Sequence, residues 1–308
     1  MGVISSLGEV SGMPVIDRDS CIRCGDCATA CPTGVLTMDA ATNEVRIDPT
    51  ASFGCIACAH CMMACNTDAI RVNGRGLLPT HLATLPPREA RATAEQLEAL
   101  MLARRSVRKF QDKPVPAELL DRIVAAAATA PLGIPPAEVG VVVLPSRERV
   151  AALAHDAANG YAGMLRFLDR PWLLALLRPF IGRKLFLQLR SFLLPLGREI
   201  VAADKRGQDL ALYGAPAALI FHVSPWADAG AAAIVATYAM LAAESLGLGT
   251  CMIGCVPPIL SMNRRLAAAY DIPAGHKPKL ILNLGYSATE YAHAIRRPLH
   301  SVTYSRGR

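Results

Sequence analysis

The stretch CIRCGDCATACP at residues 21–32 and its counterpart CIACAHCMMACN at residues 55–66 decide the fold of the N-terminal part of the chain. Both follow the spacing C-x2-C-x2-C-x3-C, and each cysteine of the second quartet lies 34 residues after its equivalent in the first. The offset continues past the cysteines, since Thr33 and Leu36 are matched by Thr67 and Ile70. This repetition indicates a duplicated half-domain whose two copies form a pseudo-symmetric pair.

The spacing is typical of thiolate ligands to iron–sulfur clusters. Three cysteines two residues apart can surround one [4Fe–4S] cluster, and in two-cluster proteins the fourth cysteine of the run binds the other cluster. We therefore predict two interleaved ligand sets, Cys21, Cys24, Cys27 and Cys65 for one cluster and Cys31, Cys55, Cys58 and Cys61 for the other. The alternatives are structural zinc, which prefers C-x2-C pairs separated by longer gaps, and disulfides, which a reducing compartment disfavours.

Residues 13–73 resemble the bacterial two-cluster ferredoxins, including the run CPTG at residues 31–34. One departure is Asn66, where the second quartet of that family usually has proline. His60 lies inside the second quartet, and we interpret it as a partly exposed loop residue because four cysteine ligands are already present. We place a ferredoxin-like domain at residues 1–76 and a linker rich in glycine and proline at residues 77–92.

Length and composition predict a two-domain protein with a sizeable core. The chain has 308 residues, of which 52% are hydrophobic and 19% charged. Its net charge of +7 comes from the larger part, because residues 1–75 hold 5 basic and 8 acidic side chains. Two bound clusters of about −2 each would lower this charge further. With no secretory signal and no apolar run of about 18 residues, we expect a cytoplasmic protein.

The larger part, residues 93–308, reads as an α+β domain. Helical patterns at 93–103, 117–128, 146–158 and 228–246 alternate with strand patterns at 139–144, 218–223 and 280–286. The helix at 228–246 is apolar on almost every side, so we expect it to be buried centrally or in a subunit interface, which favours a homodimer. No G-x-G-x-x-G run follows a predicted strand and no P-loop motif occurs.

Three segments of this domain together carry a second resemblance. The run RRSVR at 104–108 offers guanidinium groups and a hydroxyl that suit a phosphate, LGLGTCMIG at 246–254 offers glycines for close backbone approach, and Arg296-Arg297-Pro298 is a second basic site. In order and spacing these segments resemble the FMN-dependent nitroreductase family over roughly residues 95–300. The resemblance implies a homodimer with FMN at its interface, the phosphate held by Arg104, Arg105, Ser106, Arg108 and Arg296 or Arg297, and the flavin ring lined by Met252, Ile253 and Gly254.

A loop at residues 130–138 resembles the family pattern A-P-S-G-x-N-x-Q-P only in part. Pro131 and Gly133 are kept, but Leu132, Pro135 and Ala137 replace the polar residues. We assign Pro131, Leu132 and Gly133 to the flavin pocket. Because apolar side chains cannot hydrogen-bond the flavin or a polar substrate, we expect an apolar or aromatic acceptor of the nitro, quinone or enone type.

The segment from residue 164 to residue 206 is an apolar insertion with 9 basic and 3 acidic side chains. We favour a cap over the active site or an arm around the partner subunit. Contact with an anionic membrane surface is the less favoured alternative. Tyr213 is considered as a proton donor, although a half-buried structural tyrosine is the simpler interpretation, and no catalytic acid is assigned. Cys251 and Cys255 are interpreted as small buried residues.

These observations predict an iron–sulfur flavoprotein oxidoreductase that passes electrons between two [4Fe–4S] clusters and FMN to reduce a small organic acceptor. The electron donor would be a protein or NAD(P)H, and nothing points to nucleic acid. Two alternatives stay open: an electron-carrier module between protein partners with no substrate of its own, and a zinc-stapled binding protein without redox activity.

Overall fold

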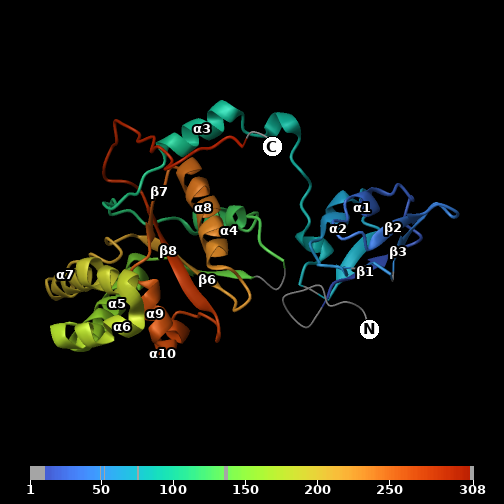
Figure 1. Ribbon diagram of the computed structural model, residues 1–308. Helices are drawn as coiled ribbons and strands as arrows, with labels where there is room; N and C mark the ends of the chain where they lie inside the picture. The colour runs from blue at the N-terminus through green and yellow to red at the C-terminus, as the bar shows by residue number, and fades with distance from the viewer. Residues whose placement is uncertain (1–10, 49, 52, 75, 135–137, 306–308) are drawn as a thin grey trace.

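The computed structural model describes residues 11–48, 50–51, 53–74, 76–134 and 138–305, apart from a few side chains within helices. An N-terminal domain and a larger α+β domain are joined by an extended linker (Figure 1). The linker contains two short 3-10 turns, η1 (Pro79–His81) and η2 (Arg88–Ala90), and nearly all of it is exposed. Leu82 is the exception, because it packs against the N-terminal core.

The N-terminal domain consists of two small antiparallel sheets and two short helices. Strand β1 (Met13–Ile16) pairs with β4 (Ile70–Asn73), so the two ends of the domain close on each other. Strands β2 (Leu36–Asp39) and β3 (Glu44–Ile47) form a hairpin. Helices α1 (Asp26–Thr29) and α2 (His60–Ala64) contact each other and share a core with both sheets.

The sequence repeat is also a backbone repeat. Left-handed conformations occur in pairs whose members are 34 residues apart: Arg23 with Ala57, Gly25 with Ala59, and Gly34 with Asp68. Gly25 and Ala59 are the residues directly before α1 and α2. The two cysteine loops therefore follow the same path, although the second has a side chain where the first has glycine.

The larger domain is built on a four-stranded antiparallel sheet in the order β5-β6-β8-β7. Its strands are β5 (Val139–Leu144), β6 (Ala217–Val223), β7 (Gly249–Ile253) and β8 (Lys277–Gly285). Every residue of β6 is buried, because helices cover both faces of the sheet. Ile220 faces one hydrophobic core, whereas Leu219 and Phe221 face the other, as the period of two along a strand requires.

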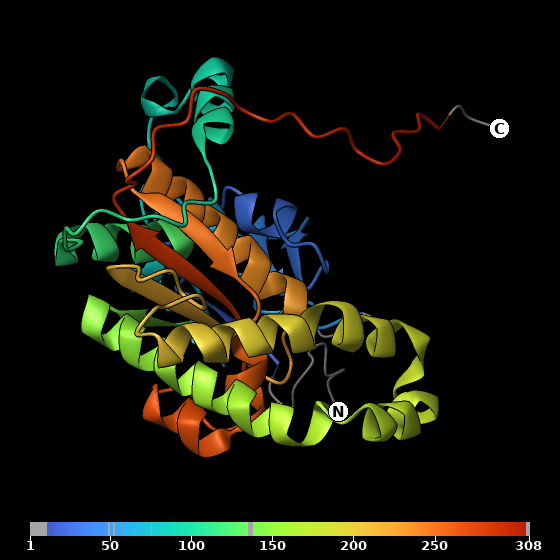
Figure 2. The same cartoon turned by 90° about the vertical axis from the view of Figure 1, so that its left-hand side faces the viewer.

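Two layers of helices enclose this sheet (Figure 2). The core on one face is completed by α4 (Ala117–Ala127) and α8 (Ala229–Ser245). The other face is covered by α5 (Arg147–Leu168), α7 (Leu194–Lys205), α9 (Pro257–Met262) and α10 (Arg264–Ala269). Helix α3 (Ala94–Ala103) lies near the end of α8, and α6 (Pro171–Gln188) with the π-helical turn η3 (Leu189–Leu193) connects α5 to α7.

The apolar helix predicted at 228–246 is observed as α8, but it is not buried on every side of the single chain. Ala232, Ala236 and Ala239 are fully buried against the sheet, whereas Ile234 and Tyr238 on another face are exposed. Two more differences concern length and type. Helix α5 continues ten residues beyond the predicted end, and the glycine-rich run at 246–254 contains strand β7. None of the helices in the described ranges is both long and apolar enough to span a bilayer.

Candidate functional site

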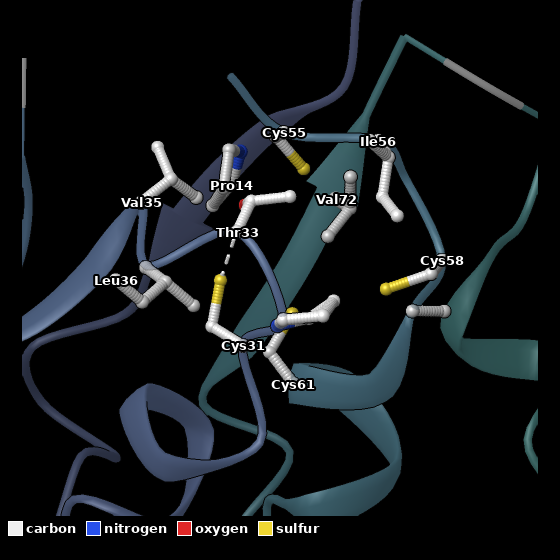
Figure 3. Close-up of a pocket in the computed structure, with 12 residues that line it drawn as sticks. Pro14, Cys31, Thr33, Val35, Leu36, Cys55, Ile56, Cys58, Cys61 and Val72 are labelled. Carbon is white, nitrogen blue, oxygen red and sulfur yellow. Dashed lines mark hydrogen bonds between the residues drawn. The ribbon is translucent and has the colours of Figure 1, made fainter. Parts of the chain in front are cut away.

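The eight N-terminal cysteines surround two separate cavities. One cavity has about 290 Å³ of space free of protein atoms and is lined by Cys31, Cys55, Cys58 and Cys61. Figure 3 shows the sulfur-bearing side chains of these four residues around a common space, with apolar residues such as Pro14 and Val72 forming its walls. The other cavity, with about 330 Å³ of space free of protein atoms including its opening to solvent, is lined by Cys21, Cys24, Cys27 and Cys65. Each cavity thus takes three cysteines from one loop and the fourth from the other.

The fourth cysteine of each loop has the same hydrogen-bonding surroundings. The sulfur of Cys31 lies 3.5 Å from the hydroxyl of Thr33, and the sulfur of Cys65 lies 3.7 Å from that of Thr67. The backbone N–H of Ala69 also donates to Cys65 Sγ, over 3.2 Å. These contacts orient the two crossing cysteines and place donors where negative charge on sulfur would lie.

Burial raises the pKa of some cysteine thiols around these cavities, whereas hydrogen bonding lowers the pKa of others. Burial, helped by the neighbouring Cys55 and Cys58, raises the pKa of Cys61 to about 12. Burial would also raise the pKa of Cys31, but donation from Thr33 and from nearby backbone N–H groups outweighs it and lowers that pKa. The same balance, with Thr67 as the donor, lowers the pKa of Cys65. A cationic iron core is the kind of group that would hold all four sulfurs of a cavity as thiolates.

The donor set of each cavity fits a [4Fe–4S] cluster. Four sulfur donors and apolar walls are the ligands and the surroundings that such clusters use. Among the described residues, no three His, Cys, Asp or Glu side chains converge closely enough to hold a single metal ion. Gly12 leaves room for one of the ligands, because a Cβ at this position would lie 2.8 Å from Cys55 Sγ. The cysteine loop and β1 therefore approach each other closely enough to require glycine.

In the larger domain, the arginine segment at residues 104–108 lies against strand β7. Helix α3 begins with a capping box between Thr93 and Gln96 and ends at Ala103, so Arg104 starts an extended stretch. Ser106 forms a bridge with Thr250, and the N–H of Val107 donates to Thr250 O over 2.8 Å. The contact is close because Gly249 has no side chain: a Cβ there would lie 2.5 Å from Val107 Cγ2.

The guanidinium groups of this segment are not neutralised by carboxylates. Within the described ranges, none of Arg104, Arg105 and Arg108 forms an ion pair, although Arg105 donates to His293 O over 3.2 Å. The Nε of Arg105 is buried and has no hydrogen-bond partner there. Burial raises the pKa of Glu244, at the end of α8, against the opposing effect of Arg104 and Arg105. A buried donor without a partner, in a cluster of positive charge, suits an anionic ligand.

Tyr213, which the sequence analysis considered as a proton donor but interpreted more simply as a structural tyrosine, lies in this region. The guanidinium carbon of Arg108 lies 5.9 Å from the centre of the Tyr213 ring. Tyr213 has a positive φ of 58°, and both carboxylate oxygens of Asp209 hold its turn by accepting from Leu212 N and Gly214 N. The only signal in the sequence was the polar and glycine-containing turn DLALYG, which does not reveal the arginine contact.

The remaining predicted flavin contacts come from two other segments of the chain. Pro131, Leu132 and Gly133 are exposed and follow α4, on the approach to β5, which is the sheet edge opposite to β7. Arg296 and Arg297 are exposed in the extended C-terminal segment.

The predicted ring-lining residues differ in their exposure. Ile253 packs into the core, so only its backbone could line a ligand, whereas Met252 is partly exposed and Gly254 is exposed. The predicted replacements Pro135 and Ala137 lie outside the described residues. Cys251 is buried, as the sequence analysis expected, whereas Cys255 is only partly buried.

The fold and these two regions define a class of protein: a chain with a sulfur-rich N-terminal domain and an α+β domain with an arginine-rich sheet edge. Comparison with known families is more specific. The chain belongs to the nitroreductase family, whose model matches residues 101–286, and is therefore an oxidoreductase. A 4Fe–4S binding domain is matched at residues 13–36, which contain the first cysteine quartet.

Individual relatives agree with this assignment. An FMN reductase [NAD(P)H] from Bacillus subtilis is 30% identical over 202 residues, covering 65% of this chain and 69% of the relative. A nitroreductase from Bacteroides fragilis with bound FMN has a TM-score of 0.52 and 19% identity, covering 68% of this chain and 99% of that one. A nitroreductase from Desulfitobacterium hafniense with bound FMN gives 0.50 and 20%, covering 68% and 98%. These two structures support the fold alone.

Proposed function

We propose that the protein is an iron–sulfur flavoprotein that passes electrons between two [4Fe–4S] clusters and FMN and reduces a small apolar or aromatic acceptor. The observation that carries the proposal is the interleaved arrangement of two cysteine quartets around two cavities in a chain of the nitroreductase family. A cluster exchanges one electron, whereas a flavin exchanges one or two, so two clusters match one complete flavin turnover.

The arginine segment is the proposed phosphate site for FMN. Arg104, Arg105, Ser106 and Arg108 would hold the phosphate through charge-assisted hydrogen bonds, and the backbone of 252–254 would line the ring. The unpartnered Nε of Arg105 and the absence of ion pairs at these arginines in the described ranges support this role. The FMN reductase relative supports it by kinship.

A homodimer would complete the flavin pocket. The exposed loop Pro131–Gly133 leads into β5, and the arginine segment lies against β7 at the opposite edge of the sheet. The loop of a second subunit is therefore a better candidate to contact these arginines than the loop of the same chain. The exposed Ile234 and Tyr238 of α8 offer an apolar contact face. In Figure 2 the C-terminal segment leaves the domain as an extended arm, and it carries exposed apolar residues such as Leu299 and Tyr304. Such an arm could pack on the partner and bring Arg296 or Arg297 to its phosphate site.

The acceptor and donor are proposed by class. Leu132 and Ile134 are exposed and apolar, which favours a nitroarene, quinone or enone over a strongly polar substrate. The donor would be NAD(P)H or a reduced electron-carrier protein. A reducing compartment such as the cytoplasm is part of the proposal, because eight closely grouped thiols would otherwise pair as disulfides.

Cofactor analysis after anaerobic purification tests the proposal. We expect about eight iron and eight sulfide ions per chain, as two [4Fe–4S] clusters require, together with one FMN. Zinc in place of iron, or protein without flavin, would contradict it. An electron-carrier module is the second candidate, since the exposed Cys24 lets a protein partner approach one cavity. Failure of the holoenzyme to reduce any nitroarene, quinone or enone, combined with rapid exchange with a carrier protein, would favour that module.

A further inference from the structure

The insertion forms a helical hairpin that extends beyond the sheet (Figure 2). The end of α5 leads into α6, which is kinked at Gly182 and followed by η3 and α7. The tertiary contacts of α6 are chiefly with α5 and η3. None of the α6 side chains that the structure describes is buried. The hairpin tip is therefore not a lid packed on the rest of its own chain.

Large apolar side chains are exposed along this hairpin. Trp172 is 63% exposed and Phe180 is 83% exposed, and Phe167 and Phe192 on the neighbouring helical turns are exposed to similar degrees. Contiguous exposed aromatic residues are rare on a protein that has no partner for them. Four exposed aromatic side chains within one insertion therefore favour contact with another apolar phase.

The charges on the hairpin all have the same sign beyond its base. From residue 170 to residue 198 there are six basic side chains and no acidic one. At the base, the Nε of Arg198 donates to Asp169 Oδ1 over 3.0 Å, which ties α7 to the end of α5. The other five cations form no ion pair with any described residue. Arg178 lies over the ring of Phe186, 5.5 Å from its centre, so cationic and aromatic groups share one surface.

We propose that this hairpin docks on the surface of an anionic lipid bilayer. Trp172, Phe180 and Phe192 would enter the boundary between head groups and acyl chains, while the cations bind lipid phosphates. The long stems of arginine and lysine can lie along the apolar surface with their charges at the head groups. The proposal concerns attachment at the surface, since α6 is broken by the non-helical conformation of Gly182.

Contact between the hairpins of two copies of the chain is a poorer arrangement for this surface. A symmetric contact between two hairpins would place each set of cations against its equivalent, with no carboxylate between residues 170 and 198 to compensate. An anionic bilayer supplies both missing partners at once, because it combines an apolar phase with negative charge. This inference is independent of the proposed cofactors and substrate.

Vesicle flotation with the full-length holoprotein tests the proposal. We expect the protein to float with vesicles containing phosphatidylglycerol, to bind phosphatidylcholine vesicles at least tenfold more weakly, and to be released by high salt. The double variant Arg183→Glu/Lys184→Glu should lose binding to anionic vesicles. The matched variant Arg264→Glu/Arg265→Glu, on the exposed surface of α10, should keep it. Equal binding of both variants, or no binding by the wild-type protein, would overturn the proposal.

Tryptophan fluorescence gives an independent readout, because the chain has only two tryptophans. In a Trp226→Phe background, Trp172 is the only indole. Its emission should shift to shorter wavelength with anionic vesicles and be quenched more by brominated than by ordinary lipids. The variant Phe180→Ser/Phe192→Ser should weaken binding, whereas Met262→Ser, which removes an exposed apolar side chain elsewhere, should not. The emission of Trp172 could instead be blue-shifted without vesicles and move to longer wavelength when the protein is diluted. This result would show that a second copy of the chain covers the surface, and it would refute membrane docking.

Discussion

Gly12 donates its backbone N–H to Cys55 O over 3.1 Å, and a Cβ on Gly12 would lie 2.8 Å from Cys55 Sγ. The chain just before β1 therefore fixes the position of the first cysteine of the second loop. Because a side chain at position 12 would push against this sulfur, the packing of β1 and the geometry of one cluster site depend on each other.

The first prediction concerns this contact. Gly12→Val should displace Cys55 and selectively damage the cavity lined by Cys31, Cys55, Cys58 and Cys61, leaving about four iron ions per chain in place of about eight. Iron and sulfide analysis of anaerobically purified protein would measure the loss. Met13→Ala, which shortens the adjacent exposed side chain, is the control and should keep the full iron content. Full iron content in the valine variant would show that the close approach is unimportant.

A second prediction concerns the two threonine hydroxyls. Thr33→Val and Thr67→Val each remove a donor to one crossing cysteine, and a hydrogen bond to sulfur favours the more negative, reduced cluster. Each change should lower the potential of one cluster by roughly 20–60 mV, if the bond contributes about 0.5–1.5 kcal/mol. The effect should be larger for Thr33, whose contact is shorter, 3.5 against 3.7 Å. Redox titration followed by electron paramagnetic resonance measures it, with Thr42→Val in the β2–β3 turn as control.

The third prediction concerns backbone strain. Ala59 has a φ of 60°, where its repeat equivalent is Gly25 with a φ of 83°. A left-handed alanine costs roughly 1–2 kcal/mol, so Ala59→Gly should leave the N-terminal domain as resistant to urea as before or more so. Ala28→Gly inside α1 should weaken it by about 0.5–1 kcal/mol. Cluster absorbance during urea unfolding ranks the variants, and a strongly weakened Ala59→Gly would mean that the αL conformation is not strained.

The fourth prediction concerns the arginines beside β7. A charge-assisted hydrogen bond contributes about 1.5–3 kcal/mol, so Arg105→Ala should weaken FMN binding about 10- to 150-fold. Titration of flavin-free protein, followed by FMN fluorescence, would measure this affinity. Arg122→Ala, on the exposed surface of α4, should bind FMN like the wild-type protein. Unchanged affinity in Arg105→Ala would remove the arginine segment as the phosphate site.

The fifth prediction concerns pH. Burial, followed by the neighbouring His276, lowers the pKa of His222 below the ordinary value of 6.5. The unfolded chain therefore binds a proton more readily than the folded one, so the larger domain should lose stability as the pH falls below about 6.5. The His222 ring lies directly against Gly140, so His222→Gln would alter packing as well as protonation. His276→Gln removes the neighbouring imidazole and leaves the packing of His222 on Gly140 in place. This second variant should therefore reduce the pH dependence of stability. Stability that stays constant between pH 7.5 and 5 in the wild-type protein would contradict the expectation.

The sequence predicted the parts that depend on short-range pattern. The 34-residue offset of the cysteine quartets predicted their interleaving, because a tight loop leaves the fourth cysteine facing away from the other three. Strand β5 and helix α8 were located within a residue or two, because each has an unbroken apolar pattern between clear ends. Family membership followed from RRSVR and the glycine-rich run, although neither indicates a sheet edge by itself.

Other features depend on contacts that a linear pattern does not contain. Strand β7 was missed because Gly249 within it and the glycines on either side obscure the period of two, and its pairing with β8 is a long-range choice. The Arg108–Tyr213 contact joins residues more than 100 positions apart. The insertion was expected to cap the active site or wrap a partner, and its composition alone did not show that α6 would extend from the domain with exposed aromatic residues.

The most direct test of the central claim follows the clusters during one turnover. Protein reduced in the absence of oxygen is mixed rapidly with a quinone or nitroarene, and reoxidation of the clusters is recorded with FMN bound and after FMN has been removed. The account predicts fast reoxidation with FMN and at least a tenfold slower reaction without it. Equal rates in the two samples would mean that electrons leave the clusters without passing through the flavin.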